Sequence, residues 1–174
     1  MLPPLVQRAL ELERAQGFDR SCAPEVGRLL HVLAAERGRT RVAEIGTGAA
    51  VGAAWIVSAL APQVPFFTAE LDKARASAAV ELFRDDENVH VLLGDWRETL
   101  PREAPFDLLF FDAAKHLRPR EDAELAIGLL APGGIAVLDD LTPPVTEVWL
   151  AHPAIVAVQL ATTEADTAIL AVRR

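Results

Sequence analysis

The sequence predicts an α/β protein with a doubly wound, mostly parallel sheet. Five short apolar runs of strand length recur along the chain, and longer stretches of helical character separate them. Such alternation favours parallel pairing of the strands, with helices on both faces of the sheet. Two further apolar runs end the chain, joined only by Thr162 to Asp166. Because so short a link cannot hold a parallel crossover, this pair predicts an antiparallel C-terminal hairpin.

Two helices are expected before this alternation begins. Leu5, Ala9 and Leu12 recur at helical spacing, and a second helix follows Pro24, with Gly38 marking its end. The prolines of segment 141–144 predict a loop. The predicted strands are 41–45, 65–70, 89–93, 106–111, 134–139, 154–161 and 167–174, and the predicted helices of the core are 49–60, 72–83 and 121–130.

Length and composition limit the possible functions. A chain of 174 residues fits one domain, 1–174, with N-terminal helices over 1–38 and an α/β core over 39–174. The net charge of −8 and the scattered arginines argue against nucleic acid as a partner. No apolar run is long enough to span a membrane, and the first residues lack the pattern of a signal peptide. Cys22 is the only cysteine, which suits a reducing compartment, so we expect a cytoplasmic protein.

The residues that follow each strand are the candidate ligand-binding groups, because ligands of open α/β sheets bind outside the carboxyl ends of the strands. Gly46-Thr47-Gly48 follows the first strand and leads into a helix, as a nucleotide-like cofactor requires, although a simple tight turn has the same pattern. Glu70 ends the second strand, where a carboxylate can accept hydrogen bonds from ribose hydroxyls. In the alternative interpretation it only caps a helix, a role that we assign instead to Asp72.

Two other carboxylates have two interpretations each. After the third strand, Gly94-Asp95-Trp96 offers an acceptor for an adenine amino group and an aromatic plane for its ring, or else a common turn with a plug. Glu44 is either a buried carboxylate held by turn amides or a group directed at a cofactor ammonium. We favour the second role, since a buried carboxylate without partners is costly.

Three aspartates follow the fourth and fifth strands. Asp112 ends one, and Asp139 with Asp140 ends the other, so a divalent ion such as Mg²⁺ is their natural counter-charge. The alternative is that Asp139 and Asp140 point to opposite faces of the sheet. Lys115 and His116 are candidate bases. Lys115 needs a lowered pKa for this role, whereas the ordinary pKa of histidine is already near neutrality.

Together, these motifs resemble those of a known family. The chain resembles the class I S-adenosylmethionine-dependent methyltransferases, and specifically the bacterial O-methyltransferases related to the catechol and caffeoyl-CoA enzymes. The resemblance runs from about Ala23 to the C-terminus and implies a seven-stranded sheet with an antiparallel terminal strand. It rests on VAEIGTGAAVGAAWI, FFTAELDKARASAA, VHVLLGDWRETLP, FDLLFFDAAK and LLAPGGIAVLDDL, in this order.

The resemblance also implies roles for individual residues. Lys115 falls where catechol-type enzymes place their base. Ala50 stands where a glycine is frequent, a replacement that is tolerable if the backbone there is not left-handed. Asp140 stands where the third metal ligand is usually Asn, and the segment 141–153 is shorter than in the family. The implied cofactor-binding residues are Glu44, Gly46, Thr47, Gly48, Glu70, Leu71, Gly94, Asp95, Trp96 and Asp112, and the implied metal ligands are Asp112, Asp139 and Asp140.

The expected function is therefore transfer of a methyl group from S-adenosylmethionine to a hydroxyl of a small-molecule acceptor, with assistance from a divalent cation. A homodimer through the apolar N-terminal helices is also expected. Three alternatives stay open: a metal-independent methyltransferase of the same fold, a cofactor-binding module without catalysis, and a nicotinamide dehydrogenase. The clustered aspartates argue against the dehydrogenase, which does not need them.

Overall fold

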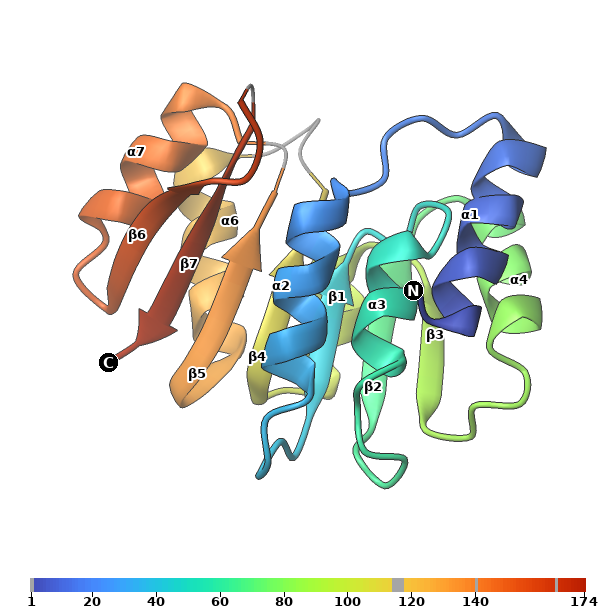
Figure 1. The fold of residues 1–174 in the computed structure, drawn as a ribbon. Coiled ribbons are helices and arrows are strands. Elements are labelled where there is room, and N and C mark those ends of the chain that lie inside the picture. The colour runs from blue at the N-terminus through green and yellow to red at the C-terminus, as the bar shows by residue number, and fades with distance from the viewer. Residues whose placement is uncertain (1, 114–117, 140, 165) are drawn as a thin grey trace.

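The computed structural model describes residues 2–113, 118–139, 141–164 and 166–174. They form one seven-stranded sheet in the order β3-β2-β1-β4-β5-β7-β6 (Figure 1). Strands β1 to β5 pair in parallel, whereas β7 pairs antiparallel with both β5 and β6. This confirms the predicted mostly parallel sheet and its antiparallel hairpin. The strands are β1 Val42–Ile45, β2 Phe66–Glu70, β3 Val89–Leu93, β4 Phe106–Phe111, β5 Leu130–Leu138, β6 Ile155–Ala161 and β7 Thr167–Arg173.

Helices cover both faces of the sheet. Helices α1 to α4 contribute buried side chains to one hydrophobic cluster, and α5 to α7 contribute to the other. In Figure 1, α2 and α3 lie in front of the sheet and α6 lies behind it. The helices are α1 Pro4–Gln16, α2 Pro24–Ala34, α3 Val51–Val57, α4 Lys73–Leu82, α5 Trp96–Thr99, α6 Pro119–Leu129 and α7 Pro143–Ala151, with a 3₁₀ helix η1 over Leu100–Arg102. Among the described residues, no helix has the length and apolar character needed to cross a membrane.

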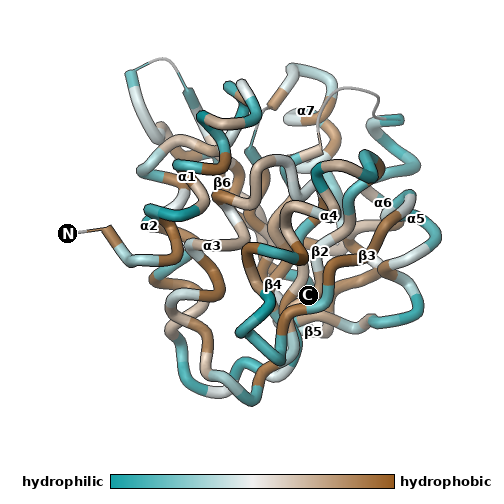
Figure 2. Tube along the Cα trace, turned by 90° about the vertical axis from the view of Figure 1, so that its right-hand side faces the viewer, coloured by the Kyte–Doolittle hydropathy of each residue, from teal (hydrophilic) through white to brown (hydrophobic). Residues whose placement is uncertain are grey.

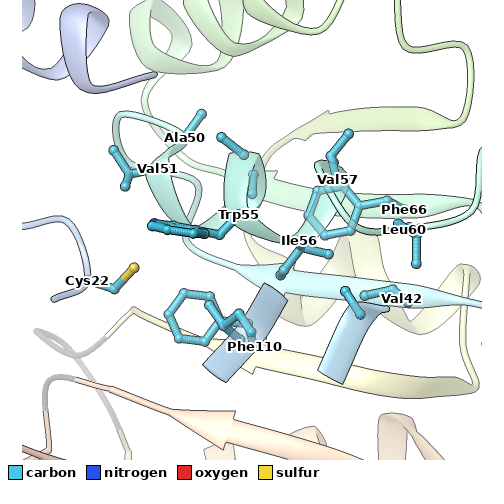
Figure 3. Close-up of a cluster of buried hydrophobic side chains, with 14 of the residues drawn as sticks. Cys22, Val42, Ala50, Val51, Trp55, Ile56, Val57, Leu60, Phe66 and Phe110 are labelled. Atoms are coloured by element: carbon cyan, nitrogen blue, oxygen red, sulfur yellow. The ribbon is translucent and has the colours of Figure 1, made fainter. Parts of the chain in front are cut away.

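The apolar runs that predicted the strands form the centre of the molecule. Apolar stretches follow the inner strands, while the outer loops are largely hydrophilic (Figure 2). Between the sheet and α3, Trp55 and Ile56 pack against Phe110 of β4 and Val42 of β1 (Figure 3). This packing fixes α3 over the strands whose carboxyl ends carry the candidate site.

The prediction of a loop over 141–144 is wrong at its second half. Helix α7 begins at Pro143, and Pro143 and Pro144 occupy its first turn. Proline is well tolerated there, because the first N–H groups of a helix have no intrahelical acceptor and the ring presets φ near the helical value. Val145 and Trp149 are buried against the sheet, and this packing stabilises the helix.

Other differences concern element boundaries. Helix α2 ends at Ala34, four residues before the glycine that was expected to end it, and Gly38 instead takes a left-handed turn conformation with φ 98°. Strand β5 begins at Leu130 and includes the shift in register opposite Phe106 and Leu108. Helix α5 was not predicted, because its four residues are too few to show helical periodicity.

The order of the strands reverses at β1. Strand β2 lies on one side of β1 and β4 on the other, so the crossovers from these strands leave on opposite faces. A crevice at the carboxyl ends of the strands is expected at such a switch point. Gly46, Gly94 and Asp112 follow the carboxyl ends of β1, β3 and β4, and Glu70 is the last residue of β2.

Candidate functional site

The turn between β1 and α3 has an unusual backbone. Gly46, Gly48 and Ala50 all have positive φ, at 89°, 54° and 64°. At Gly46 the absence of a side chain is required twice, since a Cβ there would also lie 2.7 Å from the carbonyl oxygen of Asp112. The turn can therefore bring backbone N–H groups close to a ligand.

The expectation that alanine is tolerable at position 50 because the backbone there is not left-handed is wrong. The backbone of Ala50 is left-handed, and its fully buried side chain belongs to the cluster shown in Figure 3. A left-handed alanine costs about 1–2 kcal/mol relative to the right-handed conformation. The tolerance of alanine at this position therefore depends on the buried methyl group, which contributes about 0.8 kcal/mol.

Two substitutions at Ala50 test this balance. In Ala50→Gly the relief of backbone strain stabilises the folded state, whereas the loss of the buried methyl group and the greater freedom of the unfolded chain destabilise it. Because these effects oppose each other, we expect a free energy of unfolding within about 1 kcal/mol of the wild type. Ala50→Val keeps the left-handed φ and adds a branched side chain, so we expect a loss of about 2 kcal/mol or more. Urea unfolding of the two variants measures both values. A valine variant as stable as the wild type would contradict the left-handed assignment.

Glu70 stands at the carboxyl end of β2 with an ordered carboxylate. Its Oε2 accepts from the backbone N–H of Gly48 at 2.9 Å, and its Oε1 accepts from Asp72 N at 2.8 Å and from Arg75 Nη2 at 3.0 Å. Asp72 caps α4 by accepting from the backbone N–H of Arg75, which confirms that prediction and lowers the pKa of Asp72. Glu70 therefore joins the glycine turn to the first turn of α4.

Of the two side chains after β3 with predicted roles, one lies at the site and the other caps a helix. Trp96 is buried against Phe111 and lies at the rim of the site. Asp95 caps α5 by accepting from the backbone N–H of Arg97, and it forms an ion pair with the guanidinium of Arg97 at 3.2 Å. The structure thus gives Asp95 the turn chemistry that was the alternative interpretation.

Glu44 lies below the site rather than in it. Its carboxylate accepts from the Thr68 hydroxyl at 2.6 Å, and a Cβ on Gly52 would lie 2.6 Å from Glu44 Oε1. Burial raises the pKa of Glu44 from 4.5 to about 8, and the charge of Glu70 acts in the same direction. Glu44 is not among the residues that line the cavity, so the predicted direct contact with a cofactor ammonium has no geometric support.

The predicted metal ligands are only partly within the described residues. Phe111 of β4 pairs with Leu138 of β5, so Asp112 and Asp139 follow neighbouring strand ends. Asp140, Lys115 and His116 lie outside the described residues. Within residues 2–113, 118–139, 141–164 and 166–174, no three His, Cys, Asp or Glu side chains group as metal ligands would.

Most of the predicted cofactor-binding residues line one cavity of about 290 Å³. Its size and its mixture of apolar and polar groups are typical of a small-molecule site. It lies where β1, β2, β3 and β4 end, and Asp95 does not line it. The predicted residues that line it are Gly46, Thr47, Gly48, Glu70, Leu71, Gly94, Trp96 and Asp112.

The site combines a glycine turn, a carboxylate at the end of a strand and a tryptophan at the rim of the cavity. The residues that form it belong largely to a part of the chain that matches a known family. The family model described as a methyltransferase domain matches residues 43–141, more than half of the chain. The chain belongs to this methyltransferase family.

Curated relatives of the methyltransferase domain carry corresponding names. A protein of Mycolicibacterium vanbaalenii named as an O-methyltransferase is 33% identical over 122 residues, which cover 67% of this chain and 54% of that protein. A Mycobacterium tuberculosis protein, also named as an O-methyltransferase, is 32% identical over 121 residues, covering 66% and 54%. The chain thus spans about half the length of the curated relatives it matches.

Solved structures share the fold over nearly the whole chain. The O-methyltransferase TomG of Streptomyces achromogenes, in complex with SAM, has a TM-score of 0.82 and 25% identity, covering 99% of this chain and 91% of TomG. An O-methyltransferase from Bacillus cereus in complex with SAH also has a TM-score of 0.82, at 21% identity, covering 100% and 92%. The likeness to the Bacillus protein shows the fold alone.

Several residues that line the cavity were not predicted from the sequence, and four of them have large or charged side chains. Phe18 and Arg20 come from the segment between α1 and α2, and Arg75 and Arg97 come from α4 and α5. The Phe18 ring lies over Gly48, with the guanidinium carbons of Arg20 and Arg75 at 5.3 and 5.8 Å from its centroid. The sequence does show Phe18 as a large apolar residue in a polar segment between two helices. Nothing in the neighbouring residues indicates that its ring points into the cavity.

Proposed function

We propose that this chain transfers the methyl group of S-adenosylmethionine to a hydroxyl oxygen of a small-molecule acceptor. The observation that carries the proposal is the joint placement of the Gly46–Gly48 turn and the Glu70 carboxylate on one cavity. Membership of the methyltransferase family and the SAM reported with TomG support the same cofactor.

The lining residues fit such a cofactor. Glu70 presents a carboxylate that can accept hydrogen bonds from ribose hydroxyls, and Trp96 offers apolar surface at the rim for an adenine ring. Gly46 and Gly48 let a methionine moiety approach the backbone closely. We infer that Thr47 and Asp112 contact the same moiety, since they line the cavity beside this turn.

The reaction requires positioning and a base. When bound, the cofactor supplies an electrophilic methyl group on a sulfonium, and the methyl carbon exchanges its bond to sulfur for a bond to the acceptor oxygen. The cavity walls orient the two partners and exclude water. The acceptor hydroxyl loses its proton, and we propose Lys115 or His116 as the group that takes it.

Assistance by a divalent cation is the finer part of this proposal. It is supported by the aspartates at the ends of two neighbouring strands, since Asp139 N donates to Phe111 O directly before Asp112. Oxygen ligands of this kind suit Mg²⁺, which lowers the pKa of a bound hydroxyl. We propose Asp112, Asp139 and Asp140 as its ligands.

Calorimetric titration with S-adenosylhomocysteine, with Mg²⁺ and with a chelator, tests the cofactor. We expect binding in both conditions. In a separate assay with S-adenosylmethionine as the methyl donor, we expect methylation of a vicinal diol to be at least tenfold slower with the chelator. Equal turnover in both conditions would favour the metal-independent methyltransferase, and binding without turnover of any diol would favour the non-catalytic module. Absence of binding would contradict the proposal and make NAD the next ligand to test.

We further predict three properties from the sequence. The acceptor is a small molecule rather than a nucleic acid or a membrane, the protein is cytoplasmic, and the N-terminal helices form a homodimer interface. Sedimentation that shows a stable monomer at micromolar concentration would contradict the dimer.

A further inference from the structure

Two hydroxyl groups connect the cavity to a buried acid. Thr47 lines the cavity, and its Oγ1 lies 2.6 Å from Thr68 Oγ1. Thr68 Oγ1 in turn lies 2.6 Å from Glu44 Oε2. Thr47, Thr68 and Glu44 are at most 4% exposed, so solvent does not compete for these bonds. This Glu44–Thr68–Thr47 relay links a carboxyl outside the cavity to a side chain in its wall.

The direction of the hydrogen bonds depends on one proton. Each hydroxyl has a single proton to donate. When Glu44 is ionised, Thr68 donates to it, so Thr47 must donate to Thr68 and can only accept from a group in the cavity. When Glu44 is protonated, it can donate to Thr68, and Thr68 can then donate to Thr47. The proton of Thr47 is thereby released to point into the cavity.

The surroundings of Glu44 favour the protonated form when the cavity holds no cation. Among the described residues, the charge that acts on Glu44 is that of Glu70 on β2, which is negative, while α3 contributes the backbone N–H of Ala53 and β4 contributes the Phe110 ring. The Cys22 thiol in the segment before α2 is close enough to be affected by the charge of Glu44, and burial raises the pKa of this thiol, so it is neutral as well. Burial raises the pKa of Glu44 to about 8. No positive charge among these neighbours opposes protonation.

We propose that Glu44 and Thr68 are positioning residues that set the hydrogen-bonding polarity of Thr47, and that binding of the cationic cofactor expels the Glu44 proton through this relay. The inference rests on the proposed function, because it needs a ligand that carries an ammonium or sulfonium group into the cavity. A positive ligand favours both an ionised Glu44 and a Thr47 oxygen that accepts. Affinity should therefore rise with pH up to about the pKa of Glu44.

The expected size follows from the fraction of ionised Glu44. If the ligand binds only to the ionised form, its apparent Kd is divided by that fraction, so the Kd should fall about fivefold between pH 7 and pH 8. At pH 7, binding should release close to one proton per molecule, since about 90% of the free protein then holds it. A merely structural role for Thr68 would not change this proton count.

The test is calorimetric titration with S-adenosylmethionine, without an acceptor, at pH 7 in phosphate and in Tris, because the difference in heat between the buffers counts the protons released. Glu44→Gln, which cannot ionise, should release at least tenfold less than the wild type. Thr68→Val keeps the shape but breaks the relay, and should release less than half as much. Thr68→Ser restores the hydroxyl and should match the wild type. Ser58→Ala, which removes a hydroxyl that bonds within α3, is the matched control and should also match it.

The outcomes separate the relay from the proposed function. Binding by the wild type with heats that do not depend on the buffer would overturn the relay and leave the methyltransferase assignment standing. Thr68→Val releasing as many protons as the wild type, while Glu44→Gln releases none, would assign the coupling to charge acting through space and overturn the role of Thr68. Absence of binding by the wild type would overturn both proposals.

Discussion

Replacement of Gly46 by alanine is expected to lower affinity for S-adenosylhomocysteine at least 100-fold and to destabilise the fold by about 2–4 kcal/mol. The backbone φ of 89° disfavours any side chain, and the new Cβ would lie 2.7 Å from Asp112 O and 3.1 Å from Ala113 Cβ. Because Asp112 O is a backbone atom, relief requires movement of the turn or of the end of β4. Both border the cavity. Calorimetric titration and urea unfolding of the same preparation measure the two effects.

Gly133→Ala is the matched control for this variant. Gly133 also has a positive φ, at 77°, but a Cβ there would meet nothing within 4 Å. It lies near the amino end of β5, on the opposite edge of the sheet from the cavity. We expect a loss of about 1–2 kcal/mol from the backbone alone, with unchanged affinity. Equal affinity of Gly46→Ala and the wild type would contradict the assignment of the turn to the cofactor.

Glu44→Gln is expected to remove a large pH dependence of stability. The carboxyl of Glu44 has a pKa of about 8 in the folded protein, above its ordinary 4.5. Below pH 4.5 both the folded and the unfolded chain hold the proton. Between pH 4.5 and 8 only the folded chain holds it, so stability falls as pH rises, by about 1.4 kcal/mol per pH unit and on the order of 5 kcal/mol in total. Above pH 8 the loss levels off.

Urea unfolding from pH 5 to pH 9 checks this expectation. The buried amide of glutamine loses a hydrogen bond, which shifts the stability of the variant by about 1–3 kcal/mol. This shift is the same at every pH. The stability of the variant relative to the wild type should therefore increase steadily up to pH 8. Glu81→Gln, at an exposed side chain in α4, should follow the wild type throughout. A constant difference between Glu44→Gln and the wild type would show that the buried carboxyl does not titrate as expected.

Most of the fold could be predicted because its signals are local. The apolar runs at 89–93 and 106–111 coincide with β3 and β4, and the cap at Asp72 depends only on the three residues that follow it. Helix α7 could not be predicted in this way, because Pro143 and Pro144 are equally compatible with a loop and with the first turn of a helix. Burial of Trp149 against the rear face of the sheet decides between them.

For the candidate site, the location could be predicted from the sequence, but the direction of individual side chains could not. Its location follows from the chain alone, since the residues after parallel strands must meet at one edge of the sheet, and Gly46, Glu70 and Trp96 do so. The direction of each side chain at that edge does not follow from the pattern of the strands. Asp95 faces Arg97 and α5 rather than the cavity, and Phe18 reaches the cavity from a segment without any motif.

The sequence by itself determined the order of the strands along the chain, the edge of the sheet at which the candidate site lies, and the family. These depend on hydrophobic periodicity and on short motifs, which survive without knowledge of the packing. Only the tertiary structure decided that Ala50 is left-handed and that Glu44 lies beneath the cavity, in contact with it through Thr68 and Thr47. Both are consequences of how α3 packs over β1 and β4, because the helix that buries Glu44 also fixes the turn in front of it.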